Sequence, residues 1–127
     1  MEGKIGLIFN GVWSQYAMAS SPKYRSLYEL LYIHEFESNR LNKFDALVIP
    51  FQSNQEALSK HRKVLYDFLA KGKKIAVFGD STPKWIEANW EDRPVNNYWW
   101  VSEPNNPPIA HTDQTHPVFK SLAPRHA

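Results

Sequence analysis

The chain has 127 residues, of which 43% are hydrophobic and 22% charged, a composition typical of a globular domain with its own core. Fifteen basic and 13 acidic residues leave a net charge of +2, too small to indicate a protein committed to nucleic acid. No cysteine is present, which excludes disulfides, thiolate metal sites and a cysteine nucleophile.

We expect a single domain over residues 1–127, located in the cytoplasm and without membrane contact. The first residues lack the pattern of a signal peptide. No apolar run approaches the ~20 residues of a membrane-spanning helix. The lack of cysteine suits a reducing compartment.

The first predicted strand covers residues 4–9 and ends at Asn10-Gly11, a pair that favours a turn. A polar and aromatic stretch follows, and Pro22 then predicts the first turn of a helix over residues 22–31. Residues 32–37 are predicted either as a short second strand or as an extension of that helix.

The strongest pattern is a strand, a helix and a second strand in succession over residues 45–78. Residues 45–50 form a nearly continuous apolar run, as expected of a strand covered on both faces. Ser53 stands three residues before a glutamate, the spacing of a capping box. Apolar residues at steps of three and four then predict one helix that ends at Gly72. Residues 75–78 predict the next strand.

The pattern weakens after Gly79. Residues 83–90 predict a short helix, residues 96–101 a strand, and residues 102–108 a loop with three prolines. The tail from residue 109 has no clear period.

A crossover between parallel strands is right-handed in nearly all proteins. We therefore expect an α/β fold, a three-layer α/β/α sandwich with a mainly parallel sheet. Ligands of such sheets bind outside the carboxyl ends of the strands. The predicted ligand-binding residues lie in the loops at those ends, with one tryptophan beside them: Asn10, Gly11, Trp13, Gln52, Ser53, Asn54, Gly79 and Asp80.

Three segments carry a resemblance to a known family. They read FDALVIP at residues 44–50, KGKKIAVFGDS at 71–81 and HPVFKSL at 116–122. Together with the helix between the first two, they resemble the class I glutamine amidotransferase-like superfamily, in particular its trehalose-utilisation-like branch. The resemblance covers residues 4–122 and implies a flavodoxin-like fold.

The chain departs from the catalytic members of that family at two motifs. Those enzymes have Gly-x-Cys-x-Gly after the strand at 75–78, whereas Ser81 takes the cysteine position here and Pro83 that of the second glycine. Their oxyanion hole is typically Pro-Gly-Gly, and here it is Pro50-Phe51-Gln52. Both departures count against glutamine hydrolysis, because a serine hydroxyl is far less acidic than a thiol and bulky residues disturb backbone donors.

Ser81 allows a catalytic interpretation as a nucleophile, with His111 or His116 as base and Asp113 orienting the base. The alternative is that residues 80–82 cap a helix that begins at Pro83. The same late histidines and aspartate offer only three metal ligands at irregular spacing, so we expect no metal and no other cofactor.

Two functions remain open. The first is a non-catalytic glutamine amidotransferase-like domain that acts in small-ligand binding or in protein assembly. Its aromatic content of 14%, with five tryptophans, favours core and interface positions for these rings over sugar stacking. The expected partners are a homo-oligomer or another protein, and a small polar or sugar-like ligand stays open. The alternative is a hydrolase of a small polar or carbohydrate-like substrate that uses Ser81 with a late histidine. The basic residues over 60–74 are expected on a solvated helix face, not on nucleic acid.

Overall fold

The computed structural model describes residues 4–35, 37–79, 81–82, 84–88, 98–105 and 115–117. The chain divides into two compact units, residues 1–90 and residues 91–127. The first unit contains the sheet. The expectation of a single domain stays a prediction, and each unit is described by itself.

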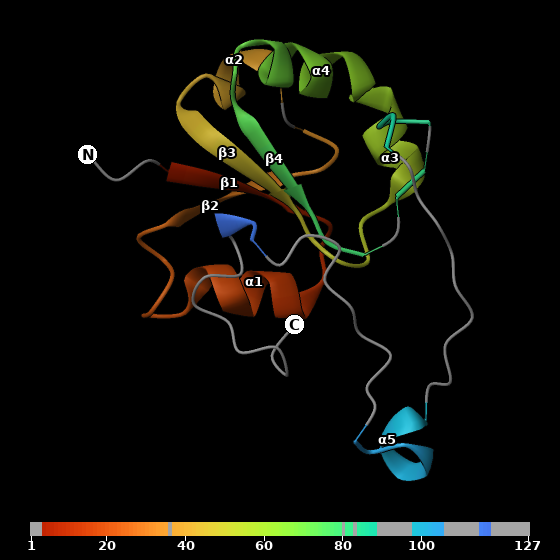
Figure 1. The fold of residues 1–127 in the computed structure, drawn as a ribbon. Helices are drawn as coiled ribbons and strands as arrows, with labels where there is room; N and C mark the ends of the chain where they lie inside the picture. Colours follow the sequence, from red (N-terminus) through yellow and green to blue (C-terminus); the bar gives the residue numbers. More distant parts are fainter. Residues whose placement is uncertain are drawn as a thin grey trace. The chain divides into compact units, whose positions relative to one another are not determined.

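The first unit is built on four parallel strands in the order β2-β1-β3-β4 (Figure 1). The predicted α/β class with a parallel sheet is therefore confirmed, and the order matches the first four strands of a flavodoxin-like sheet. The two apolar runs of the strongest predicted unit pair directly, with Leu47 opposite Ile75. The strands are β1 (Lys4–Phe9), β2 (Tyr28–Tyr32), β3 (Phe44–Ile49) and β4 (Lys74–Val77).

Helices lie on both faces of this sheet (Figure 1). Helix α1 (Trp13–Ser20) covers one face, where it packs on β1 and β2. Helices α2 (Ser38–Leu41), α3 (Gln55–Lys60) and α4 (Arg62–Ala70) lie on the other face. No helix within the described residues is long and apolar enough to cross a membrane.

The main core lies between the sheet and the second helical layer. Its side chains come from alternate positions of the strands and from the apolar stripe predicted for residues 57–69. Their burial supplies the main stabilisation of the unit, since apolar burial contributes ~25 cal/mol per Å². The cluster contains Ile8, Leu31, Ile33, Leu41, Phe44, Leu47, Ile49, Ala57, Leu58, Leu65, Phe68 and Trp85.

The predicted helix over residues 22–31 is wrong. The helix lies earlier, at α1, and residues 28–32 form β2 beside β1, with Leu31 opposite Ile8. The leucine spacing that suggested a helix places Leu31 in the core equally well from a strand. Only the first residue of the alternative strand at 32–37 belongs to β2, and residues 33–35 form a turn.

The helix predicted to run to Gly72 is interrupted at His61. His61 has φ −98° and ψ 7°, so α3 ends and α4 begins there. Its Nε2 lies 2.7 Å from the carbonyl oxygen of Ile33, a contact that fixes the break against the end of β2. Gly72 has the positive φ of 76° expected of a residue that follows a helix end.

The predicted capping box is also corrected, by one residue. Asn54, not Ser53, caps α3, because its side-chain oxygen accepts a hydrogen bond of 2.9 Å from the Ala57 amide. Asn is as good a cap as Ser. Ser53 uses its hydroxyl elsewhere, as described below.

Two predictions for the second half of the chain are wrong over the residues that the structure describes. Residues 84–88 hold a turn at Lys84-Trp85 in place of a helix, and Trp85 is buried in the core. In the second unit, the predicted strand at 96–101 gives way to α5 (Trp99–Ser102), which is held by local hydrogen bonds such as Val101 N–H to the Tyr98 carbonyl. Aromatic strand propensity depends on a neighbouring strand, and none pairs with these described residues.

The close packing of the core around Gly6 of β1 can be tested by adding a methyl group at this position. A Cβ at this position would lie 2.7 Å from Leu47 Cδ2 and 2.9 Å from Leu31 Cδ1. We expect Gly6→Ala to lower the free energy of unfolding by about 1–3 kcal/mol, the usual effect of overpacking. Urea unfolding followed by circular dichroism measures it.

The matched control enlarges an exposed position of β4. Ala76→Val is expected to change the free energy of unfolding by less than about 0.5 kcal/mol. Equal stability of Gly6→Ala and the unmodified chain would contradict the described packing of β1.

Candidate functional site

The strand order reverses between β1 and β3, which are neighbours in the sheet. The chain leaves β1 toward α1 on one face and leaves β3 toward α3 on the other (Figure 1). Such a switch point separates two loops at the carboxyl edge and is the usual ligand position in open α/β sheets. Here the loops are residues 10–12 and 50–54, which we call the switch loops.

Asn10 links the two switch loops through its side-chain amide. Its Oδ1 accepts a hydrogen bond of 2.8 Å from the Asn54 backbone N–H. Its Nδ2 lies 3.1 Å from Ser53 Oγ and 3.2 Å from the Ile8 carbonyl oxygen, and donates to both. One amide therefore joins the end of β1 to the start of α3.

Gln15 makes a second link from within α1. It is only 5% exposed, and its Oε1 accepts a hydrogen bond of 2.9 Å from the Asn10 backbone N–H. Its Nε2 donates to the Phe51 carbonyl oxygen at 3.1 Å. Gln15 is not among the site residues predicted from the sequence, because no helix was expected at this position. A helix there would have put Gln15 on the same face as Ala19.

The predicted ligand-binding residues Asn10, Ser53 and Asn54 are thus brought together, but their side chains hold the loops. Ser53 Oγ donates to the Pro50 carbonyl oxygen at 2.6 Å while it accepts from Asn10. Asn54 caps α3. The Asn10 amide, the Ser53 hydroxyl and the Asn54 side-chain oxygen are engaged within the protein, so these groups position the neighbouring residues.

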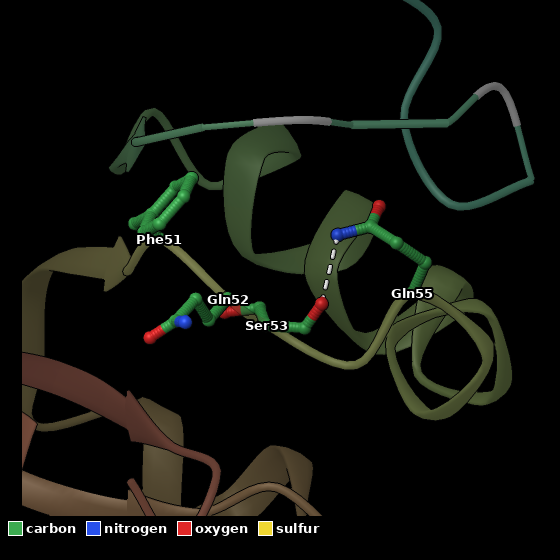
Figure 2. A pocket seen from close by; sticks show the side chains of 4 residues that line it. All are labelled: Phe51, Gln52, Ser53 and Gln55. Carbon is green, nitrogen blue, oxygen red and sulfur yellow. Dashed lines mark hydrogen bonds between the residues drawn. The ribbon is translucent and has the colours of Figure 1, made fainter. Parts of the chain in front are cut away.

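Phe51 and Gln52 face outward from the loop after β3. The Phe51 side chain is 63% exposed, and Gln52 is exposed as well. Figure 2 shows the two side chains on different sides of the loop that leaves β3. They line a hollow of about 210 Å³ together with Ser53 and Gln55. Three of its four described lining side chains are polar, and the Phe51 ring supplies apolar surface.

Gln55 fixes the far wall of this hollow. Its Nε2 turns back and donates to the Ser53 carbonyl oxygen at 3.1 Å, the dashed line in Figure 2. Its Oε1 accepts a hydrogen bond of 2.7 Å from the indole N–H of buried Trp85. The wall is therefore anchored to the core.

Gly79 brings the loop after β4 to the same place. Its φ is 84°, and a Cβ there would lie 2.4 Å from Phe51 Cδ2, so only glycine fits beneath the ring. Gly11, with φ 82°, turns the chain between β1 and α1. Both glycines were predicted at the site, and both serve its backbone.

Trp13 lies at the start of α1 and is 75% exposed. Its ring centroid is 5.6 Å from that of Tyr16, which is 6.4 Å from Phe9. Trp13 does not belong to the described lining of the hollow in Figure 2. Its predicted role in ligand binding stays a prediction.

The described part of the chain does not test the predicted catalytic triad. Ser81 is half-buried. Its φ is not positive, since Gln52 is the one described residue other than glycine with a positive φ. Ser81 therefore lacks the left-handed backbone that marks a strained turn. Asp80, His111 and Asp113 lie outside the described residues, and His116 belongs to the second unit. The triad stays a prediction. No group of three or more potential metal ligands occurs among the described residues.

Comparison with protein-family models, with curated proteins and with solved structures gives no match.

The backbone of Gln52 provides a test of the loop geometry. Its φ of 66° costs a side-chain-bearing residue roughly 1–2 kcal/mol, which glycine avoids. Glycine also adds about 0.4–1 kcal/mol of entropy to the unfolded state. We therefore expect Gln52→Gly to leave the free energy of unfolding unchanged or to raise it by up to about 1 kcal/mol.

Gln55, three positions further along the chain, is the control. Gln55→Gly removes the partner of the Trp85 indole and is expected to cost about 2 kcal/mol in the same urea titration. A large loss of stability in Gln52→Gly, equal to that of Gln55→Gly, would mean that the Gln52 backbone is not left-handed.

Proposed function

We propose that this chain is a non-catalytic, glutamine amidotransferase-like domain that binds a small ligand at the carboxyl edge of β1 and β3. The observation that carries the proposal is the hydrogen-bonded link between the switch loops. It fixes Phe51 and Gln52, two exposed side chains of the loop after β3, at the position where open α/β sheets bind ligands.

The backbone after β3 supports the family part of the proposal. In the family that the sequence resembles, a Pro-Gly-Gly segment follows this strand. Here Gln52 holds the place of the second glycine and has a φ of 66°, a value that glycine prefers. The loop after β4 also turns at a glycine with positive φ, Gly79.

The side chains at the same loops support a non-catalytic role. The chain has no cysteine to act as nucleophile. The Phe51 ring covers Gly79, at the approach to the position of that nucleophile in the family. The hydroxyl of Ser53 is engaged with Asn10 and Pro50 and is not poised to attack a substrate.

The choice of a small ligand rests on the size of the hollow. A volume of about 210 Å³ is smaller than the ~300–1,000 Å³ typical of drug-sized ligands. The lining glutamines offer amide groups, which fix orientation by hydrogen bonds.

Saturation-transfer NMR on mixtures of small metabolites tests binding and turnover in one experiment. We expect at least one compound to bind without forming product. Phe51→Ala should weaken its binding by roughly tenfold or more, because a buried phenyl contact contributes ~1.5–3 kcal/mol.

Tyr32→Ala is the matched control, because it removes another exposed ring, 42% exposed, that does not line the hollow. It should leave binding unchanged. Absence of any bound compound, or equal binding to Phe51→Ala, would contradict the proposal. Product signals that disappear in Ser81→Ala would establish the hydrolase instead.

A further inference from the structure

Three of the hollows that described residues line meet at Phe51. Besides the hollow of Figure 2, one of about 210 Å³ is lined by Ser14, Gln15, Met18, Pro50, Phe51 and Gln52. The largest of the three, about 290 Å³, is lined by Met18, Tyr28, Val48, Pro50, Phe51 and Phe78. The last two share Met18, Pro50 and Phe51, so they adjoin around the Phe51 ring.

The apolar hollow follows from the position of α1. This helix packs on β1 and β2. Val48 of β3 and Phe78, which follows β4, therefore retain exposed surface beside Met18 of α1. Phe78 is 59% exposed and Phe51 63%. Exposed apolar surface gathered around a hollow marks a binding surface more often than isolated exposed residues do.

The described residues of this region carry no charge. Residues 5–22 and 46–55, which supply both switch loops and α1, contain no Asp, Glu, Lys, Arg or His. None of the described residues that line the three hollows is charged. A charged group moved from water into such a hollow would lose hydration without gaining a counter-charge from these residues, which is unfavourable. An apolar group would gain ~25 cal/mol for each Å² removed from water.

We infer that the ligand of this site is a small uncharged molecule with two parts. An apolar ring or short chain occupies the hollow between Met18, Val48 and Phe78. A neutral polar group at its other end reaches the exposed side chains of Ser14 and Gln52 across the Phe51 ring. This inference rests on the proposed function and differs from the small polar or sugar-like ligand considered from the sequence.

Three probes with the same apolar body test the inference: 2-naphthol, which is uncharged at neutral pH, the 2-naphthoate anion and the 2-naphthylmethylammonium cation. Isothermal titration of the full chain should show 2-naphthol binding at least roughly tenfold more tightly than either ion. Tighter or equal binding of an ion would overturn the inference, as would the failure of 2-naphthol to bind.

Substitutions locate the bound probe. Phe78→Ala, at a position that is 59% exposed, should weaken the binding of 2-naphthol at least severalfold, and Tyr32→Ala should not. Met18→Glu should abolish binding by placing a carboxylate in the apolar hollow, whereas Ser20→Glu adds the same charge at an exposed position of α1 outside it. Circular dichroism confirms that each variant is folded. Equal effects of the two members of either pair would overturn the assignment to this hollow.

The two proposals fail separately. A metabolite that binds in the NMR screen, depends on Phe51 and carries a charge would overturn the uncharged ligand and leave the binding function standing. A screen without any bound metabolite would overturn the function itself.

Discussion

The amide of Asn10 is the interaction on which the rest of the site depends. The neighbouring strands β1 and β3 send the chain to opposite faces of the sheet, so their loops separate unless a side chain joins them. Asn10 does this because a carboxamide both donates and accepts, and here it reaches Ser53 Oγ and the Asn54 amide at once. An aspartate could accept from Asn54 but could not donate. Gln15 supports the link from α1 by binding the Asn10 amide and the Phe51 carbonyl.

These hydrogen bonds between the switch loops determine which residues can contact a ligand. The side chains of Asn10 and Ser53, nearest the switch point, are engaged in hydrogen bonds within the protein, and leaving them unsatisfied would be costly. What remains outward is a phenyl ring and a glutamine on a left-handed backbone, with apolar surface of β3 and Phe78 beside them. The character of the site therefore follows from the fold. A polar loop sequence yields a largely apolar and uncharged surface.

The sequence was sufficient to predict the framework of this site. The apolar runs of β1, β3 and β4 were recognised, and parallel topology brings their carboxyl ends together whatever the intervening helices do. The sequence was not sufficient to predict helix α1. Val12, at its N-terminus, offers no side-chain cap, and the first and last turns carry no acidic or basic residue. Nor could the sequence choose between Ser53 and Asn54 as the cap, since both types cap well and the contact of Ser53 with Asn10, 43 positions away, decides. Local sequence does not report such tertiary bonds.

A double-mutant cycle between Asn10 and Ser53 tests this account most directly. Asn10→Ala, Ser53→Ala and the combined variant are unfolded in urea, and the free energies of unfolding are compared. If the two side chains are hydrogen-bonded, the summed losses of the two single variants should differ from the loss of the combined variant by about 0.5–1.5 kcal/mol. Losses that add within roughly 0.3 kcal/mol would contradict it, because the switch loops would then be held independently of each other.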